Sequence, residues 1–321
     1  MARRRILWGR VFASACVLIA LIFLLGACVS SCFGGDDPNS SAPGPIVVSR
    51  TDSSVADPYH SSADSSGNTK PDSPTLGSYT EVSVAPAQIY SGDLVLVNST
   101  YASHLSEDEL SLEKVAYFAG KPDCYSVSYP ARTLLNTTAL TRFNAMMEMY
   151  FSATANKEIM VNDGYLPKGS SNSTGESTSG LSIQLHLNKS SGGFGYITNK
   201  EPYSWVYNNM DDYGFILRYP AGKEDLTGTA ATDTVIRYVG VPHAAYMNDF
   251  GLCLEEYHTM LKEQYAYGTG MLRYETGGKS YLIYYVPANL TGSTEVPVPI
   301  TGDYTISGNN FDGFIVTVTE G

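Results

Sequence analysis

Residues 208–228 read NNMDDYGFILRYPAGKEDLTG, and residues 236–257 read IRYVGVPHAAYMNDFGLCLEEY. In the first stretch a short apolar run is followed by a Pro-x-Gly turn, which is typical of a strand that ends in a loop. The second stretch begins with another apolar run and continues with apolar residues at helical spacing. Together they predict strands at 215–218 and 234–239, followed by helices at 242–250 and 254–265.

The preceding part of the chain predicts further helices and strands. Apolar residues repeat at helical spacing between Leu140 and Phe151, which indicates the buried face of a helix. Ser106 and Glu109 form a capping box, so we expect a helix from there to Phe118. The other expected elements are strands at 93–98, 158–162 and 181–187 and a helix at 202–213. The predicted fold class is α+β, with helices packed on a small, mostly antiparallel sheet.

From Tyr267 onward the pattern becomes rich in β-strands. Runs at 271–275, 280–286, 294–300, 304–307 and 314–319 alternate or are β-branched, and glycine-containing turns separate them. This segment is small for a core of its own, so we expect it to pack against the preceding domain. Its tyrosines at 281, 284 and 285 fit sheet packing, and a glycan-binding face is the alternative.

The two quoted stretches resemble the second half of VanY-type D-alanyl-D-alanine carboxypeptidases, which are zinc enzymes that trim peptidoglycan stems. The matching residues follow the family motifs YGF, RYPxGKExxTG and RYVG, and the closing helix, at the same spacing. They are Tyr213, Gly214, Phe215, Arg218, Tyr219, Pro220, Gly222, Lys223, Glu224, Thr227, Gly228, Arg237, Tyr238, Val239, Gly240, Leu254, Glu255, Glu256 and Tyr257. The resemblance implies a DD-carboxypeptidase (Hedgehog-like) fold with a C-terminal β-rich appendix.

The residues that hold zinc in the resembled family are absent here. Counted back from RYVG, the family's catalytic Glu falls on Thr232 and its zinc-ligand His on Val235. The motif Ser-x-His-x-x-Gly-x-Ala-x-Asp aligns on Gly180, which puts its His on Ser177 and its Asp on Gln184. A catalytic zinc needs about three protein ligands, and a general base must be able to take a proton. We therefore expect no zinc cofactor and an inactive site.

The carboxylate-binding side of the family site is altered as well. In the family, an Arg within Ser-Gly-Tyr-Arg-Ser binds the terminal carboxylate of D-alanine. The corresponding run here keeps Tyr165 but has Leu166 in the place of the Arg. Leu offers no hydrogen-bond donor to a carboxylate. A helical segment that the family places between the two motifs is also missing, since residues 168–179 are rich in Gly and Ser.

A replacement metal site is the alternative to an empty one. Of the five histidines, only His186 lies near the former zinc motif, because it is two residues from Gln184 on the same face of a strand. With Asp233 and Glu176 it would supply a His/Asp/Glu ligand set. The simpler interpretation is a strand histidine beside an emptied cleft. The expected cleft residues are Tyr165, Leu166, Ser177, Gln184, His186, Thr232, Asp233 and Val235.

The N-terminus carries a membrane-targeting pattern. Four arginines among residues 1–10 precede nineteen uncharged, mostly aliphatic residues at 11–29, about the length that crosses a ~30 Å hydrocarbon core. The positive-inside rule then places the rest of the chain outside the cytoplasm. We favour a single-span anchor. A lipoprotein signal with Cys28 as the lipidated residue and a cleaved secretory signal remain the alternatives.

Charge narrows the range of partners. The chain has 20 basic and 32 acidic residues, and four of the basic residues belong to the N-terminal cluster. The exported part is therefore strongly acidic, which argues against nucleic acid and against electrostatic docking on anionic lipid. Peptidoglycan or a cell-wall protein is the expected partner, with the membrane contacted through the N-terminal segment.

These observations divide the chain into four segments. Residues 1–33 are the expected anchor or lipoprotein signal, and residues 34–80, rich in Ser, Asp and Pro, are the expected disordered linker. Residues 81–265 are the expected carboxypeptidase-like domain, and residues 266–321 its β-rich extension. Cys124 and Cys253 lie in the folded part, where a disulfide and two buried thiols are both possible.

Three functions fit the sequence. The first is a cell-envelope protein with an inactive carboxypeptidase-like domain that binds peptidoglycan or a wall-associated partner. The second is a divergent, active metallo-carboxypeptidase that trims D-Ala from stem peptides. The third is a structural envelope protein that uses the fold as a rigid body. Function depends on the site rather than on the fold, so metal content and wall binding are the observations that separate them.

Overall fold

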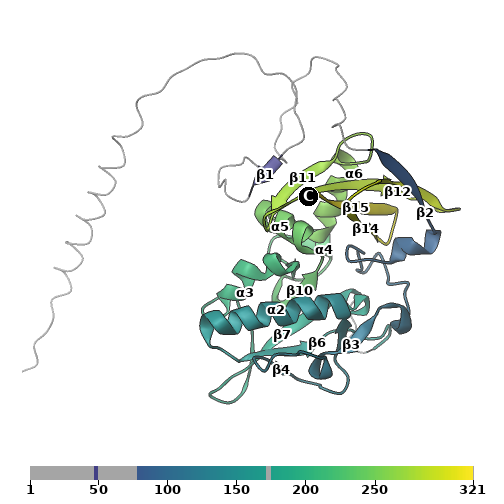
Figure 1. Ribbon diagram of the computed structural model, residues 1–321. Helices are drawn as coiled ribbons and strands as arrows, with labels where there is room; N and C mark the ends of the chain where they lie inside the picture. Colours follow the sequence, from purple (N-terminus) through teal and green to yellow (C-terminus); the bar gives the residue numbers. More distant parts are fainter. Residues whose placement is uncertain (1–46, 50–77, 171–174, 321) are drawn as a thin grey trace, which may run out of the picture. The chain divides into compact units, whose positions relative to one another are not determined.

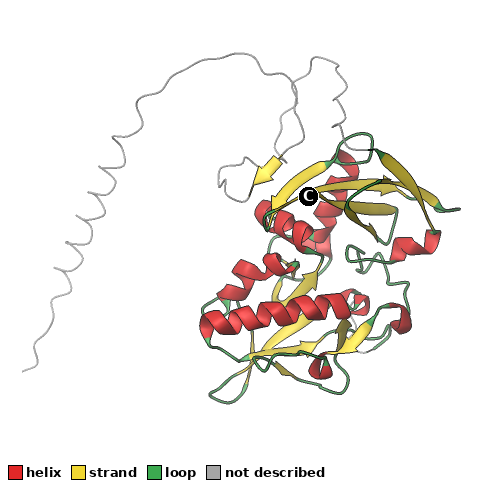
Figure 2. Ribbon diagram, viewed as in Figure 1, coloured by secondary structure: helices red, strands yellow, loops and turns green. Residues whose placement is uncertain are grey.

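Two large sheets and the helices packed on them organise the computed structural model, which describes residues 47–49, 78–170 and 175–320 (Figure 1). The fold class is α+β, as the sequence predicted (Figure 2). The expected membrane segment and nearly all of the expected linker lie outside the described residues. Within the described ranges, no helix has the length and apolar character needed to cross a bilayer.

The first sheet has the strand order β4-β6-β7-β10-β9, and β8 pairs with β7. Its strands are β4 (Ser126–Val127), β6 (Ile159–Asp163), β7 (Ser182–Asn188), β8 (Phe194–Tyr196), β9 (Phe215–Tyr219) and β10 (Thr232–Tyr238). All neighbours are antiparallel except β4 and β6. The sequence predicted β6, β7, β9 and β10 within about two residues because their apolar runs are bounded by turn residues.

Helix α2 (Thr137–Thr154) lies along one face of the first sheet (Figure 1). Its start is fixed by the side chain of Asn136, which accepts hydrogen bonds from two backbone amides of the first turn. Phe143 and Met147 on α2 are fully buried and share a core with Ile183 and Leu185 of β7. The opposite face of β7 is therefore the one left for a functional site.

The second sheet has the order β1-β11-β12-β15-β14. Its strands are β1 (Val47–Ser49), β11 (Leu272–Thr276), β12 (Lys279–Pro287), β14 (Asp303–Gly308) and β15 (Gly313–Glu320). Helices α5 (Val241–Phe250) and α6 (Leu254–Gln264) and the two-stranded ribbon of β2 (Tyr79–Val84) and β13 (Thr294–Pro299) complete this part. The sequence predicted both helices and all five strands from β11 to β15.

Both faces of the second sheet are covered. Ile283 and Tyr285 of β12 pack with α5 and α6, whereas Leu282 and Tyr284 pack with the β2–β13 ribbon. This alternation follows from strand geometry, in which successive side chains point to opposite faces. Burial of Tyr284 and Tyr285, together with the partly buried Tyr281, supports sheet packing rather than a glycan-binding face for these tyrosines.

The family-like motifs are joined by a buried ion network. Glu176, in the 3-10 turn η4 (Glu176–Ser179), is ion-paired with both Arg218 on β9 and Arg237 on β10, and all three side chains are almost fully buried. Arg218 also donates two hydrogen bonds, of 3.0 and 2.7 Å, to Glu255 on α6. Burial by itself would raise the pKa of Glu176, but the two guanidinium groups hold that pKa below its usual value.

Two glycines in the same motifs bring the chain into close contact. Gly214 follows the 3-10 turn η5 (Met210–Tyr213) with a φ of 85°, in the left-handed region that favours glycine. A Cβ at this position would lie 2.7 Å from the ring of Tyr238 and 3.0 Å from the backbone of Gly240. The YGF and RYVG motifs therefore depend on one another through this contact.

Three predicted elements differ from the structure. Residues 93–98 are largely buried but form no strand. Their backbone oxygens accept hydrogen bonds from side chains instead of from a neighbouring strand. Arg237 donates to the oxygens of Asp93 and Val95, and Asn310 donates to that of Leu96. The helix expected to run from Ser106 to Phe118 is only a 3-10 turn, η2 (Glu107–Glu109). The capping box is present, but the chain then forms strand β3 (Leu112–Lys114), which pairs with β5 (Leu134–Asn136).

The third difference is the helix expected at 202–213. It is shorter, consisting of α3 (Ser204–Asn209) and then η5. The remaining short elements are η1 (Pro86–Tyr90), η3 (Val115–Tyr117) and α4 (Glu224–Thr227). In the segments at 106–118 and 202–213, tertiary contacts shorten the helix that the local sequence signal predicts.

Cys124 and Cys253 are both buried and are not bonded to one another. The buried-thiol alternative therefore describes them. Burial raises the pKa of both thiols, for Cys253 to about 12, so they are protonated at neutral pH.

His243 links α5 to α6 and to the second sheet. Its Nδ1 lies 2.7 Å from the hydroxyl of Tyr257, and its Nε2 lies 3.0 Å from the hydroxyl of Thr317. Burial lowers the pKa of His243 to about 3, so the ring is neutral at physiological pH and has one donor and one acceptor nitrogen. Both nitrogens are satisfied, which is what a buried polar side chain requires.

We expect Glu176→Gln to destabilise the protein strongly. A neutral amide cannot balance two buried guanidinium groups, and removal of one partner from a buried ion pair costs about 3–5 kcal/mol. Urea unfolding followed by circular dichroism measures this free energy. Glu113→Gln is the matched control, since Glu113 is exposed, and it should change stability by about 0.5 kcal/mol or less. Equal stability of the two variants would contradict the assigned role of Glu176.

We expect Tyr257→Phe to lower the melting temperature, because it leaves the Nδ1 of the buried His243 without a partner. An unsatisfied buried polar group costs about 1–3 kcal/mol. Differential scanning calorimetry provides the measurement, and Tyr117→Phe, at a side chain that is 69% exposed, is the control. An unchanged melting temperature for Tyr257→Phe would show that this hydrogen bond contributes nothing.

Candidate functional site

The two strands that carry the former zinc positions lie side by side, as the sequence predicted. Gln184 on β7 is the direct register partner of Val235 on β10. Residues that are directly opposite in an antiparallel pair point to the same face, with Cβ atoms about 4.5–5.5 Å apart. Both side chains are partly exposed, on the face of β7 that is turned away from α2. The structure thus brings two of the three family ligand positions to one place.

The third ligand position, Ser177, lies in the turn η4 just before β7. Its backbone oxygen accepts a hydrogen bond of 3.0 Å from the amide of Leu166, which occupies the family's carboxylate-binding position. Tyr165 is buried, and its amide bonds to the backbone oxygen of Leu134 at 2.8 Å. The former zinc motif and the former carboxylate motif are therefore adjacent, although they come from different loops.

The side chains at positions 184 and 235 are uncharged. The Oε1 atom of Gln184 accepts a hydrogen bond of 3.0 Å from the Nδ2 atom of Asn162. The same Nδ2 atom also donates to the carboxylate of Asp163, at 3.2 Å. Val235 supplies only alkyl atoms. An amide and an alkyl side chain thus stand at the two positions that the sequence alignment pairs with zinc ligands of the family.

The position that the sequence alignment pairs with the family's general base carries a hydroxyl group. Thr232 shares a hydrogen bond of 2.8 Å with the hydroxyl of Thr234, and its register partner is Tyr219 on β9. The neighbouring Asp233 accepts a hydrogen bond of 3.3 Å from the amide of Asn199. A threonine hydroxyl cannot take a proton from water near neutral pH, so Thr232 cannot act as the base.

His186 lies on the same face as Gln184 but is enclosed by aromatic rings. The rings of Phe194 and Tyr196 meet it edge-on, with centroids 4.6 and 5.0 Å away. Burial lowers the pKa of His186, and neither ring nitrogen has a hydrogen-bond partner within the described part of the chain. The ring is thus neutral and sits in an apolar setting.

The alternative ligand set of His186, Asp233 and Glu176 is not assembled. Glu176 is fully engaged with Arg218 and Arg237 in the buried network. Among the residues that the structure describes, no three His, Cys, Asp or Glu side chains are grouped as a metal site would need.

Two pockets lie near these positions. The larger, of about 450 Å³, adjoins Leu166. Its lining is Glu107, Lys114, Ala131, Arg132, Leu134, Asp163, Tyr165, Leu166, Pro167 and Ser170. Tyr165 and Leu166 are among the cleft residues expected from the sequence, whereas Lys114 and Arg132 are not. No motif marks these two cations, because they come from segments far from Leu166 in the chain and only the fold brings them together.

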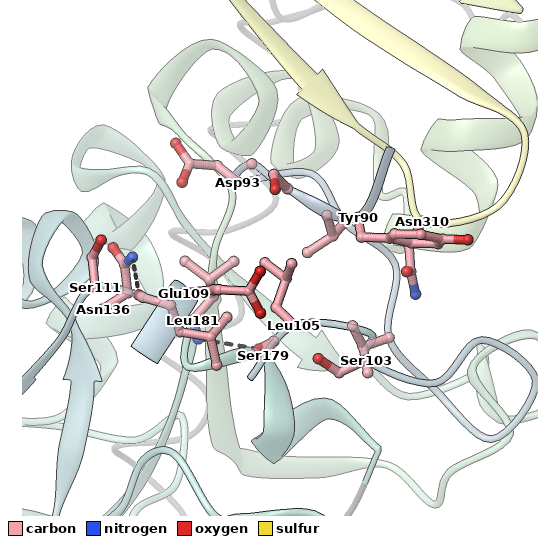
Figure 3. A pocket seen from close by; sticks show the side chains of 15 residues that line it. Tyr90, Asp93, Ser103, Leu105, Glu109, Ser111, Asn136, Ser179, Leu181 and Asn310 are labelled. Carbon is pink, nitrogen blue, oxygen red and sulfur yellow. Dashed lines mark hydrogen bonds between the residues drawn. The ribbon is translucent and has the colours of Figure 1, made fainter. Parts of the chain in front are cut away.

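The smaller pocket, of about 110 Å³, is built from four separate segments (Figure 3). The segment at 90–111 contributes most of it, Asn136 comes from the end of β5, Ser179 and Leu181 lie just before β7, and Asn310 comes from the turn before β15. Asp93 belongs to this lining, and burial raises the pKa of its carboxyl, although Arg237 counteracts the shift. None of the positions aligned with family ligands lines this pocket.

Comparison with known proteins agrees with the motif resemblance. No protein-family model matches the chain. A D-alanyl-D-alanine carboxypeptidase of Enterococcus faecium is 32% identical over 270 residues, which cover 75% of this chain and 80% of that protein. The putative carboxypeptidase YodJ of Bacillus subtilis is 44% identical over 59 residues, or 18% of this chain and 22% of that protein.

A solved structure extends the likeness to the fold. The vancomycin resistance D,D-dipeptidase VanXYg, crystallised in complex with a D-Ala-D-Ala phosphinate analogue, matches with a TM-score of 0.61 and 25% identity. The match covers 76% of this chain and 100% of that chain. The identity to the Enterococcus faecium enzyme spans most of both sequences, and the structural match agrees with it. The chain therefore belongs to the VanY-type D-alanyl-D-alanine carboxypeptidase family.

Proposed function

We propose that this protein is a catalytically inactive carboxypeptidase homologue of the cell envelope, which binds peptidoglycan stem peptides or a wall-associated partner without cleaving them. The observation that carries the proposal is the pairing of Gln184 with Val235 at two of the family's ligand positions. Hydrolysis of an amide bond by this family needs a zinc-activated water and a base. An amide, an alkyl group and the hydroxyl of Thr232 supply neither.

The proposed ligand class comes from the relatives. The Enterococcus faecium protein is a D-alanyl-D-alanine carboxypeptidase, and VanXYg was crystallised with a D-Ala-D-Ala phosphinate analogue. The pocket beside Tyr165 and Leu166 supplies a concave region next to the aligned site positions. Stem peptides that end in D-alanine are therefore the ligands to test first.

An active, divergent metallo-carboxypeptidase is the second candidate. It is favoured by the extent of the identity to the Enterococcus faecium enzyme, which covers 75% of this chain. It would need metal ligands outside the family positions, and metal content separates it from the first candidate.

We expect the purified chain to hold no stoichiometric zinc and to release no D-alanine from a pentapeptide stem. Plasma mass spectrometry after dialysis against zinc buffer and an enzymatic D-alanine assay provide the measurements. About one zinc per chain that chelation removes, together with D-alanine release, would establish the active alternative.

The matched control restores the ligands. In Ser177→His/Gln184→Asp/Val235→His, the register partners at 184 and 235 would again present zinc ligands beside position 177, so measurable zinc binding is expected. D-Alanine release should stay absent, because Thr232 still provides no base. Failure of a correctly folded triple variant to bind zinc would mean that the family positions are assigned wrongly.

We further propose that the folded part lies outside the cytoplasm, held by the N-terminal segment. The support is the arginine cluster followed by the long uncharged run at 11–29. Protease added to intact protoplasts should therefore digest the folded part or its linker, and full protection would refute this topology. Cys28→Ser separates the two kinds of attachment, since a lipoprotein would lose its acyl label and a spanning anchor would not change.

A further inference from the structure

Strand β1 comes from the middle of the expected linker at 34–80. The sequence at positions 43–50 is PGPIVVSR, and Ile46, Val47 and Val48 are the only three consecutive aliphatic residues between positions 34 and 80. β-Branched residues favour strands, whereas the Gly, Pro and Asp that are common in the rest of the linker disfavour them. The linker therefore contains one short segment that is suited to pair with a sheet.

The partner of β1 is the outer edge of β11. The two strands run parallel, and their register pairs Val47 with Arg273 and Ser49 with Glu275. On its other side, β11 pairs with β12 from Leu272 to Thr276, which is its whole length. Without β1, this strand would be the last one of the second sheet. The outward main-chain groups of such an edge strand readily pair with a further strand.

The edge of β11 is held in place by the domain itself. Leu272 and Tyr274 are fully buried in the core that α5 and α6 share with the second sheet. The hydroxyl of Tyr274 donates a hydrogen bond of 2.6 Å to Asp249 on α5, and Arg273 is ion-paired with Glu320 on β15. An acceptor that is already ordered loses little entropy when a strand is added, and main-chain hydrogen bonds then supply the affinity.

We propose that residues 47–49 are a docking segment built into the linker, which binds the β11 edge of its own chain and is released from it. Pairing over three residues is weak, and it brings the two ends of the stretch at 50–78 together, which costs entropy. The docked and released forms are therefore both accessible. The occupant is the chain's own segment rather than a second copy, because a covalent connection of this length gives an effective concentration in the millimolar range, on the order of that of other short linkers.

Docking changes the distance over which the linker holds the domain. With 47–49 docked, residues 34–46 separate the domain from the N-terminal segment, whereas residues 34–78 do so in the released form. A loose chain of n residues spans about 5–6 Å times the square root of n, which gives roughly 20 Å for the docked form and roughly 35–40 Å for the released form. This consequence rests on the proposed attachment through the N-terminal segment, and the docking itself does not.

Disulfide trapping in the full chain tests the docking. Neighbouring strands lie about 4.7–4.9 Å apart, within the Cα spacing of about 4.4–6.8 Å that a disulfide needs. Because Ser49 and Glu275 are register partners, Ser49→Cys/Glu275→Cys should cross-link under mild oxidation. The matched control is Ser53→Cys/Glu275→Cys, which lies about 13 Å of strand beyond the register position and should cross-link about tenfold more slowly. Equal rates for the two pairs would overturn the proposal.

Mass spectrometry of the digested protein identifies the peptide that joins position 49 to position 275 and separates it from peptides that contain native cysteines. Cys124 and Cys253 are buried, and burial raises the pKa of both thiols, so they react slowly. Glu275 is exposed, so its replacement should not affect folding. We expect a cross-link within one chain at a rate that does not depend on protein concentration. A cross-linked dimer whose yield rises with concentration would assign the edge to a second copy and overturn the proposal.

Proline variants provide a readout without added cysteines. Successive backbone N–H groups of a strand alternate in direction, so Val47→Pro/Val48→Pro removes a donor to β11 whichever residue supplies it. Hydrogen exchange of the β11 peptide, Leu272–Thr276, should then become faster, while exchange of β13 should stay unchanged. Ser61→Pro/Ser62→Pro, elsewhere in the linker, is the control and should leave both rates as they are. An unchanged β11 rate in the first variant would contradict the docking.

The outcomes separate the docking from the proposed function. If the register pair cross-links no faster than its control, and the chain still holds no zinc and releases no D-alanine, the docking falls and the proposed function stands. If the register pair cross-links and D-alanine is released, the inactive function falls and the docking stands. Full protection from protease in protoplasts would remove the consequence for tether length alone.

Discussion

The buried carboxylate of Glu176, held between Arg218 and Arg237, is the interaction on which the rest of this fold depends. It joins the turn before β7 to two neighbouring strands, and Arg218 extends the link to α6 through Glu255. A charge buried this deeply is costly unless every partner is present, so none of the three can change alone. The arginines of the RYP and RYVG motifs are therefore structural residues, and their place in the fold does not require a zinc site.

The same network fixes the chain path beside the position that is aligned with the family's first zinc ligand. Glu176 is the residue directly before Ser177, so the arginines fix the chain path of the former zinc motif whether or not a metal binds. In β7 and β10 the ladder between Gln184 and Val235 holds the strands together without a metal bridge. The framework is therefore held by contacts that need no metal, and the fold alone says little about activity.

Sequence reasoning located most of this framework because its signals are local. Apolar periodicity gave α2, and turn residues bounded β9 and β10. Counting from Gly180 and from RYVG placed Gln184 opposite Val235, which the register confirms. Sequence reasoning failed where contacts between distant parts of the chain decide the local structure. The segment at 93–98 lacks a strand because side chains satisfy its backbone, and the capping box at Ser106 starts only one turn because β3 pairs with β5.

Sequence reasoning did not find the larger pocket, which adjoins Leu166, for a related reason. A motif records residues at fixed spacing, whereas Lys114 and Arg132 reach the pocket from β3 and from a loop. In an enzyme of this family, a carboxylate clamp is useful only if it holds the scissile bond against the zinc and the base. Under the proposed inactive function such a clamp has no use, so the residues at positions 166, 232 and 235 share one explanation.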